Sequence, residues 1–185
     1  MVKVERKTKE VEVIAKLNLD GGEIEIDTGI GFLDHMLTTF AFHSGMGLEL
    51  KAKGDLNVDE HHTVEDVAIV LGKAFRKMLE ERKNIRRFGS SIVPMDESVA
   101  ICGVDISGRG YFVLEGELGD AGIRGENVIH FLDTFCRNSG INVYLEVKGA
   151  NAHHKIESAF KALALSLREA LKSSEGLKST KGKID

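Results

Sequence analysis

Residues 61–78 of the chain read HHTVEDVAIVLGKAFRKM, and residues 153–171 read HHKIESAFKALALSLREAL. Both stretches open with the pattern His-His-x-x-Glu, and the two patterns hold four of the seven histidines in the chain. After each pattern, apolar residues recur at intervals of three and four, which is the spacing of a helix with one apolar face. The sequence therefore predicts two related amphipathic helices, each with a histidine pair and a glutamate near its start.

Two further segments recur around these helices. Residues 32–34 (Phe-Leu-Asp) match residues 131–133, and residues 48–54 match residues 143–149. The recurrence predicts an internal duplication, in which each half holds extended segments, a helix, a strand and the helix that carries the histidine pattern. In this alignment His35, after the first Phe-Leu-Asp, lies one helical turn away from His130, which precedes the second.

The segments of each half predict an α+β fold. Alternating apolar residues indicate strands, and the turns at Asp20-Gly21-Gly22 and Ser107-Gly108 suggest hairpins. The expected hairpins pair 11–19 with 23–26 and 99–106 with 111–114, the expected helices cover about 32–43 and 127–138, and further strands cover about 48–53 and 143–148. The architecture is a duplicated strand-strand-strand-helix-strand-helix unit with helices packed on one face of each sheet. A pseudo-two-fold axis would bring the two histidine patterns together.

The two halves are expected to form a single unit over residues 1–185. They cover about 1–86 and 87–185, and the join between them is charged rather than rich in Pro, Gly or Ser. A chain of 185 residues with 42% hydrophobic side chains can bury a sizeable core. Residues 172–185 are polar, so composition alone predicts a frayed C-terminal tail.

Charge and composition disfavour several classes of function. Lys and Arg total 25 against 29 for Asp and Glu, a net charge of −4 that gives no general attraction to nucleic acid or anionic membranes. A nucleic-acid-binding module would also want stacking aromatics, yet aromatics make up 6% and Trp is absent. The charged start and the lack of a long apolar run argue against a signal peptide or membrane span, so we expect a cytoplasmic protein. Cys102 and Cys136 show no CxxC spacing and are predicted to be small buried residues.

The duplicated pattern indicates metal ligation. On a helix the first His and the Glu lie four residues apart on one face, whereas the second His points about 100° away. One pattern should therefore not give both histidines to one ion. The arrangement that uses every side chain combines His61 and Glu65 with a lone histidine of the second copy, and His153 and Glu157 with one of the first. Imidazole with carboxylate suits Mn, Fe or Zn.

The histidines also allow a structural interpretation. A single pattern would more simply be a polar helix start with a solvated histidine pair, and only its duplication favours metal ligation. His35 and His130 could each add a third nitrogen to one of the metals, or each could be a structural histidine.

These residues resemble the imidazoleglycerol-phosphate dehydratase family, and the resemblance runs almost end to end. The segments that carry it are 31–36 (GFLDHM), 59–66 (DEHHTVED), 87–89 (RFG), 107–109 (SGR) and 151–157 (NAHHKIE). The resemblance implies dehydration of D-erythro-1-(imidazol-4-yl)glycerol 3-phosphate to imidazole acetol phosphate in L-histidine biosynthesis. It also implies that each half has a fold like domain 2 of ribosomal protein S5.

The family's metal ligands map onto two mixed sets. The resemblance implies two Mn²⁺ ions per active site, one held by His35, His62, His153 and Glu157, and the other by His61, Glu65, His130 and His154. Each set combines the two copies of the pattern, as the helix geometry suggested. Four protein ligands on an octahedral ion leave room for substrate and water.

The resemblance also assigns catalytic and substrate-binding side chains. Catalysis would involve Glu10, Glu65 and Glu157, with Glu10 as the acid or base that handles protons. Substrate and its phosphate would contact Glu10, Arg87, Arg109, Lys161, Ser179, Thr180 and Lys181. His43 lies two helical turns after His35, so it either approaches the substrate or has a packing role. Lys161 lies two turns after His153 on the same helical face, which places it near the metal ligands. Asp96 and Glu97 are candidates for supporting contacts, and the polar tail is expected to order when phosphate binds.

The assembly and the main alternative follow from the same comparison. The resemblance implies a homo-oligomer of 24 subunits whose metals draw ligands from adjacent chains, although spacing alone does not say which chain supplies which ligand. The alternative is a non-catalytic metal-binding protein on the same duplicated fold. Such a protein would not need Glu10 or the phosphate-binding set, so their presence favours an enzyme that acts on a small phosphorylated imidazole.

Overall fold

Both halves of the chain fold into the same succession of elements. The structure is a computed structural model that describes residues 1–82 and 84–175. The first half contains β1 (Val2–Lys7), β2 (Val11–Asn18), β3 (Ile24–Asp27), α1 (Gly31–Ser44), β4 (Gly47–Gly54) and α2 (His61–Glu80). The second contains β5 (Phe88–Met95), β6 (Ser98–Ile106), β7 (Phe112–Glu115), α3 (Gly125–Ser139), β8 (Ile141–Lys148) and α4 (Ala152–Ala170). The predicted unit and its duplication are confirmed.

Each half forms one four-stranded sheet, with the order β1-β2-β4-β3 in the first and β5-β6-β8-β7 in the second. The third strand of each half runs parallel to the fourth, and the other neighbours are antiparallel. The predicted hairpins of β2 with β3 and of β6 with β7 are wrong, because β4 and β8 lie between these strands. A helix joins the parallel strands, as a crossover requires, and the hairpins instead join β1 to β2 and β5 to β6.

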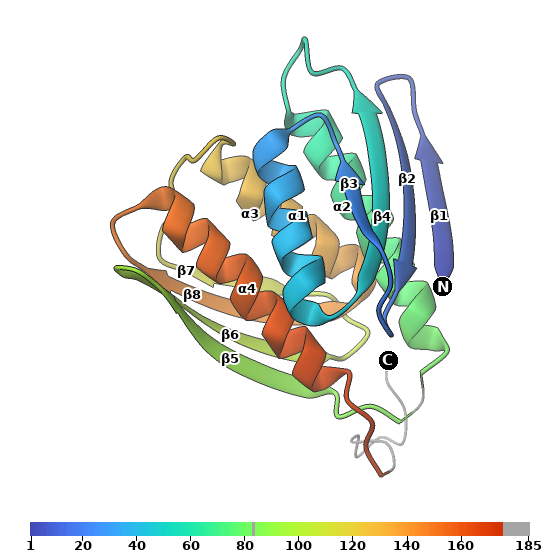
Figure 1. Ribbon diagram of the computed structural model, residues 1–185, viewed down its shortest axis with the longest axis vertical. Coiled ribbons are helices and arrows are strands. Elements are labelled where there is room, and N and C mark those ends of the chain that lie inside the picture. Colours follow the sequence, from blue (N-terminus) through green and yellow to red (C-terminus); the bar gives the residue numbers. More distant parts are fainter. Residues whose placement is uncertain (83, 176–185) are drawn as a thin grey trace.

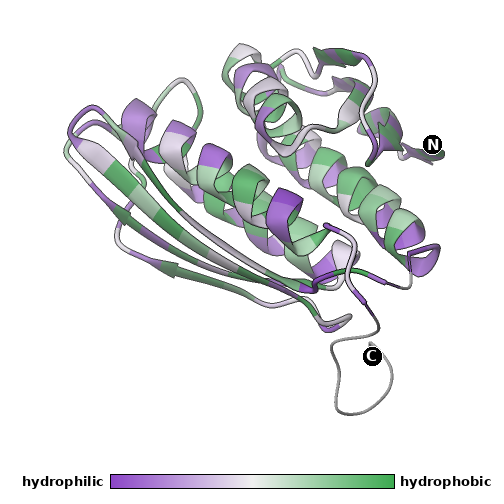
Figure 2. Cartoon of the chain, turned by 60° about the horizontal axis from the view of Figure 1, so that its bottom comes forward, coloured by the Kyte–Doolittle hydropathy of each residue, from purple (hydrophilic) through white to green (hydrophobic). Residues whose placement is uncertain are grey.

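The four helices lie between the two sheets and cover the inner face of each (Figure 1). In β2 the side chains of Val11, Val13, Ala15 and Leu17 are buried, whereas the residues between them are more exposed. Figure 2 shows the same mixture of hydrophobic and hydrophilic residues along the other strands and the helices. This alternation is that of a sheet with one packed and one solvated face. Among the described residues, no helix combines the length and the apolar character needed to cross a membrane.

Each helix packs against a helix of the other half. α1 lies beside α4, and α2 lies beside α3. The rings of Phe40 in α1, Phe75 in α2 and Phe135 in α3 meet with centroids between 5.2 and 6.3 Å apart. Buried hydrophobic residues from both halves form one cluster, so the core is shared between the halves.

The first helices of the two halves match in register at their C-terminal ends. α1 ends at Gly45 and α3 at Gly140, both in the left-handed conformation that glycine favours, with φ of 76° and 77°. His35 and His130 each precede the capping glycine by the same number of residues, so they occupy equivalent positions. The alignment of the two Phe-Leu-Asp segments, which placed these histidines one turn apart, is therefore wrong. The two halves are correctly aligned by the glycines that end the helices, not by the Phe-Leu-Asp segments.

α2 approaches α3 closely at Gly72. A methyl group there would lie 2.6 Å from Cβ of Asn138 and 2.9 Å from the carbonyl oxygen of Phe135. Gly72→Ala is therefore expected to lower the free energy of unfolding by about 1–3 kcal/mol through overpacking, measured by chemical denaturation. Gly31→Ala is the matched control, because its methyl group would meet no heavy atom within 4 Å. Equal losses in both variants would contradict a tight crossing of α2 and α3.

Candidate metal centre

All four helices begin at the same end of the helix layer (Figure 1). At the starts of α2 and α3, Oε1 of Glu60 accepts a hydrogen bond from the backbone N–H of Arg124 at 2.8 Å. At the starts of α1 and α4, the rings of Phe32 and His153 meet edge-on with centroids 5.2 Å apart. A methyl group at Gly122, just before α3, would lie 3.1 Å from Phe32, which links the two pairs. Both histidine patterns therefore lie at one end of the molecule.

The first set of candidate ligands, called the α1/α4 group, consists of His35, His153 and Glu157. Oε2 of Glu157 lies 3.0 Å from Nε2 of His153 and 3.4 Å from Nε2 of His35. His153 and Glu157 share a face because they lie one turn apart on α4, and α1 brings His35 to that face. The side chain of Glu157 is 11% exposed, whereas those of His35 and His153 are 49% and 45% exposed. The group is therefore open to solvent on its histidine side.

The second set, called the α2/α3 group, consists of His61, Glu65 and His130. The rings of His61 and His130 stack with centroids 4.8 Å apart, and Oε1 of Glu65 lies 3.8 Å from Nε2 of His130. That nitrogen is buried and has no hydrogen-bond partner among the described residues. A buried polar atom without a partner destabilises the fold unless a bound ligand contacts that atom. The buried nitrogen beside a carboxylate therefore fits a bound cation.

Both groups have the composition and spacing of a metal site. In each group, one ligand atom from every residue lies within 4.8 Å of the other two. Two imidazoles with one carboxylate suit Mn, Fe or Zn. Each group combines residues of both halves, as the predicted mixed sets do. The structure brings together three of the four predicted ligands in each set, and His62 and His154 belong to neither group within one chain.

The second histidine of each pattern is instead held through Nδ1 by a carboxylate. Nδ1 of His62 lies 3.0 Å from Oδ2 of Asp55, and Nδ1 of His154 lies 2.7 Å from Oε2 of Glu97. The hydrogen bond to Asp55 raises the pKa of His62, and the hydrogen bond to Glu97 raises the pKa of His154. His154, with further hydrogen bonds from the Asn151 backbone and from Ser98, lowers the pKa of Glu97 to about 2. Nδ1 of both histidines is therefore engaged by a carboxylate, and Nε2 of His154 also lies 3.6 Å from Oδ2 of the exposed Asp96.

Two predicted substrate-binding residues lie beside the α1/α4 group. Nζ of Lys161 lies 2.8 Å from Oε1 of Glu157. Burial opposes ionisation of Glu157, but the hydrogen bonds from Lys161 and His153 outweigh it and lower the pKa of that carboxyl. Burial and the charge of Lys161 lower the pKa of His43, against a smaller opposite effect of Glu157. His43 and Lys161 are thus close enough to the α1/α4 group to share its electrostatic environment.

Arg87 and Arg109, both predicted to bind phosphate, lie together at the far end of the second sheet. Nε of Arg87 donates to Oδ1 of Asp105 at 2.7 Å, and Nη2 of Arg109 lies 3.6 Å from Oδ2 of the same carboxylate. Arg87 directly precedes β5, whereas Lys161 contacts Met95 at the other end of that strand. A strand of this length spans about 23 Å. One chain therefore does not bring the two arginines to Lys161.

The remaining predicted residues are Glu10 and three residues of the tail. Glu10 lies in the turn between β1 and β2, with Oε2 3.9 Å from Nδ1 of His62 and a side chain that is 57% exposed. Ser179, Thr180 and Lys181 lie outside the described residues, as does most of the predicted polar tail.

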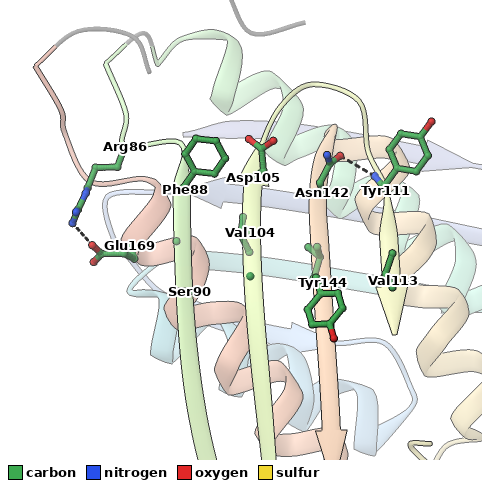
Figure 3. A pocket seen from close by; sticks show the side chains of 13 residues that line it. Arg86, Phe88, Ser90, Val104, Asp105, Tyr111, Val113, Asn142, Tyr144 and Glu169 are labelled. Atoms are coloured by element: carbon green, nitrogen blue, oxygen red, sulfur yellow. Dashed lines mark hydrogen bonds and ion pairs between the residues drawn. The ribbon is translucent and has the colours of Figure 1, made fainter. Parts of the chain in front are cut away.

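A hollow of about 630 Å³ lies on the outer face of the second sheet (Figure 3). Phe88, Tyr111 and Tyr144 line it, together with Asp105 near one end of β6. None of the predicted metal ligands lines this hollow, and Asp105 is engaged by the arginines described above. Large apolar side chains therefore make up much of the lining of this hollow.

Sequence reasoning missed two side chains that contact candidate ligands. Asp55 contacts His62, and Oδ1 of Asn127 lies 3.3 Å from Nδ1 of His61. Asn127 also donates from Nδ2 to Oε1 of Glu60 at 2.8 Å, which fixes the direction of its amide. Both residues come from other segments than the histidines that they contact, so helical spacing gives no signal for them. A correct alignment of the two halves pairs Asn127 with Phe32. Only that alignment would have shown a polar residue at Asn127 where the first half has an aromatic one.

Fold and site together define an internally duplicated α+β protein with two His-His-Glu groups suited to divalent metals. A sequence model described as imidazoleglycerol-phosphate dehydratase matches residues 28–167, which is most of the chain. The chain therefore belongs to the imidazoleglycerol-phosphate dehydratase family and is a hydro-lyase of histidine biosynthesis.

Individual relatives and solved structures agree with this assignment. The imidazoleglycerol-phosphate dehydratase of Archaeoglobus fulgidus is 56% identical over the full length of both chains. That of Chlorobaculum tepidum is 49% identical over 97% of this chain and 95% of its own. The enzyme from Pyrococcus furiosus, solved in complex with (S)-C348, has a TM-score of 0.86 and 38% identity, covering 97% of this chain and 99% of its own. The enzyme from Staphylococcus aureus has a TM-score of 0.84 and 34% identity, covering 94% and 100%.

Proposed function

We propose that the chain catalyses the Mn²⁺-dependent dehydration of D-erythro-1-(imidazol-4-yl)glycerol 3-phosphate to imidazole acetol phosphate. The observation that carries this proposal is the pair of His-His-Glu groups at one end of the helix layer. Membership of the family supports the substrate and the reaction, and the donor types of the two groups support the metal.

Two Mn²⁺ ions per active site are proposed, each held by one group and one further histidine. His62 would complete the α1/α4 group, and His154 would complete the α2/α3 group. When bound, the ions supply Lewis-acid stabilisation of negative charge on the substrate. His61 and His62, which are neighbours in sequence, would serve different ions, and so would His153 and His154.

Side chains of the chain itself would bind the substrate and move its protons. Loss of water needs a base for the proton on carbon and an acid for the departing hydroxyl, and a carboxylate can serve in turn as both. Glu10 is proposed for this role, because its exposed carboxylate lies beside His62. Lys161 is proposed to bind the phosphate, because its ammonium group lies at the edge of the α1/α4 group. The side chains of Arg87 and Arg109 would add further positive charge to the phosphate site.

The active site is proposed to lie between subunits. Within one chain each group holds three of the four proposed ligands of its metal, and His62 and His154, which contact Asp55 and Glu97, belong to neither group. The two arginines lie a full strand length from Lys161. A second copy of the chain can supply both the missing histidines and the distant arginines, whereas one chain cannot.

The proposed assembly is a homo-oligomer of 24 subunits in the cytoplasm. Its support in the structure is the outer face of the second sheet, where several large apolar side chains are exposed: Phe88, Ile92, Tyr111, Val113 and Tyr144. A contiguous exposed apolar surface of this kind is typical of a protein–protein interface. Subunit contacts would cover this surface.

The direct test is turnover of imidazoleglycerol phosphate by metal-stripped protein before and after addition of Mn²⁺. We expect no product before addition and imidazole acetol phosphate after it. The alternative of a non-catalytic metal-binding protein predicts stoichiometric Mn²⁺ binding without product. That outcome with properly assembled protein would refute the proposed function.

Lys161→Met is expected to raise the KM for the phosphorylated substrate by about 10- to 100-fold, because one hydrogen bond between charged groups is lost. Steady-state kinetics with saturating Mn²⁺ would measure the change. Lys73→Met is the matched control, since Lys73 is exposed on α2 and should leave KM unchanged. An unchanged KM in Lys161→Met would remove Lys161 from the phosphate site.

A further inference from the structure

Glu10 and Glu97 occupy equivalent positions in the two halves. β2 pairs with β4 so that Val11 lies opposite Gly54, and β6 pairs with β8 so that Val99 lies opposite Lys148. Gly54 corresponds to Gly149 in the repeat, and a methyl group at Gly149 would meet Ser98. Ser98 is therefore the counterpart of Val11. The glutamates that precede these two residues, in the first hairpin turn of each half, are counterparts of one another.

The two glutamates have different surroundings despite this equivalence. Glu97 is fixed at both oxygens: Oε2 contacts Nδ1 of His154 at 2.7 Å, and Oε1 accepts hydrogen bonds from the Asn151 backbone at 2.8 Å and the Ser98 hydroxyl at 2.9 Å. Glu10 lies 3.9 Å from Nδ1 of His62, which is beyond hydrogen-bond distance, and its side chain is 57% exposed. The same turn therefore holds a histidine in the second half and presents an exposed carboxylate to solvent in the first.

In the first half, Asp55 provides the carboxylate contact to Nδ1 of the second histidine that Glu97 provides in the second half. Its oxygens lie 3.0 and 3.3 Å from Nδ1 of His62. Asp55 directly follows Gly54, and the residue that follows the equivalent Gly149 is Ala150, which has no polar side chain. The contact to the second histidine thus comes from the hairpin turn in one half and from the loop after the fourth strand in the other.

The engaged nitrogen decides what each imidazole can do. A neutral imidazole that donates its Nδ1 proton to a carboxylate keeps the lone pair on Nε2, which is the nitrogen left to bind a metal. We propose that Glu97 and Asp55 are positioning residues that set the tautomer of His154 and His62 for metal binding. Because Asp55 holds His62, Glu10 is left free to act on the substrate. This inference rests on the proposed function of the site.

Glu97→Gln tests the inference on metal binding rather than on activity alone. The Asn151 and Ser98 donors would retain the amide oxygen of Gln, which turns its NH₂ group toward Nδ1 of His154. An NH₂ donor there favours the tautomer that carries the proton on Nε2 and cannot bind metal. Calorimetric titration of metal-stripped protein with Mn²⁺ should show affinity lowered by about 10- to 100-fold at half of the sites. The metal-free variant should remain folded, with its melting temperature lowered by a few degrees because the Glu97 carboxylate is lost.

Three companion variants complete the experiment. Asp55→Ala should lower Mn²⁺ affinity at the other half of the sites. Glu10→Gln should leave Mn²⁺ affinity unchanged and lower turnover. Glu25→Gln is the matched control, because Glu25 forms a surface ion pair with Lys51 on the first sheet and should alter neither quantity.

The outcomes separate this inference from the proposed function. Wild-type Mn²⁺ affinity in both Glu97→Gln and Asp55→Ala would overturn the positioning role while leaving the dehydratase activity intact. Wild-type protein that binds Mn²⁺ without turnover would refute the proposed function, and the affinities of the variants would still decide the positioning role. Wild-type protein that binds no Mn²⁺ would overturn both.

Discussion

Glu65→Gln and Glu157→Gln are each expected to lower turnover of imidazoleglycerol phosphate by about 10³-fold, which corresponds to several kcal/mol of lost metal-assisted stabilisation. Each glutamate is the only anionic member of its His-His-Glu group. Glutamine keeps the size of the side chain but removes the negative charge that holds a divalent cation. Turnover at saturating Mn²⁺ would measure the loss of activity, and the amount of metal bound per chain would measure the loss of metal binding.

Glu126→Gln provides the control for this pair. Glu126 lies in the first turn of α3 near the α2/α3 group, but its side chain is 71% exposed and pairs with Arg124. Its replacement should preserve both turnover and metal content. Wild-type turnover in either Glu65→Gln or Glu157→Gln would show that the corresponding group takes no part in the reaction.

A mixture of the two inactive variants is expected to regain activity. Glu65→Gln destroys the α2/α3 group but leaves the α1/α4 group and His154 intact, and Glu157→Gln does the opposite. If one chain supplies the α1/α4 group with His154 and its neighbour supplies the α2/α3 group with His62, a mixed pair can form one complete site. Random assembly of equal amounts of the two chains should then restore about a quarter of the wild-type turnover, given an interface of the head-to-tail kind.

The mixing experiment needs dissociation and reassembly of the subunits. The variants would be combined as metal-free protein, Mn²⁺ would be added, and turnover would be compared with each variant treated alone. Activity equal to the sum of the separate variants would mean that both metals bind within a single chain. Different tags on the two variants allow mixed particles to be isolated. A failure of the subunits to mix is then not mistaken for a failure of mixed particles to regain activity.

The elements of the fold could be predicted because their signals are local. Period-3.6 apolar spacing identified α2 and α4, and alternation identified most strands. The pairing of strands could not be read in this way: a turn at Asp20-Gly21-Gly22 looks like a hairpin, yet the chain crosses over through α1 before β4 pairs with both β2 and β3. Which strand enters the middle of a sheet depends on packing of the crossover helix, and this packing has no signature in the turn itself.

The candidate site could likewise be predicted from the sequence only where its signals are local. Helical geometry predicted that the two histidines of one pattern serve different ions, and the structure places His61, but not His62, in the α2/α3 group. The equivalence of His35 and His130 was obscured by a chance match of three residues. Asn127 escaped notice because it reaches His61 from the other half of the chain, and Asp55 because it lies in the loop before α2, outside the helical spacing that marks the histidines.

The packing of each helix against one from the other half also decides when the core can form. His35 and Glu157 meet across α1 and α4, although 122 positions separate them in the chain. Closing a loop of this length costs entropy before any packing compensates for it. During synthesis, α1 and α2 emerge from the ribosome well before α3 and α4 exist to cover them. The nascent first half therefore exposes its apolar helix faces until synthesis is nearly complete, which is the period when aggregation and chaperone binding compete with folding.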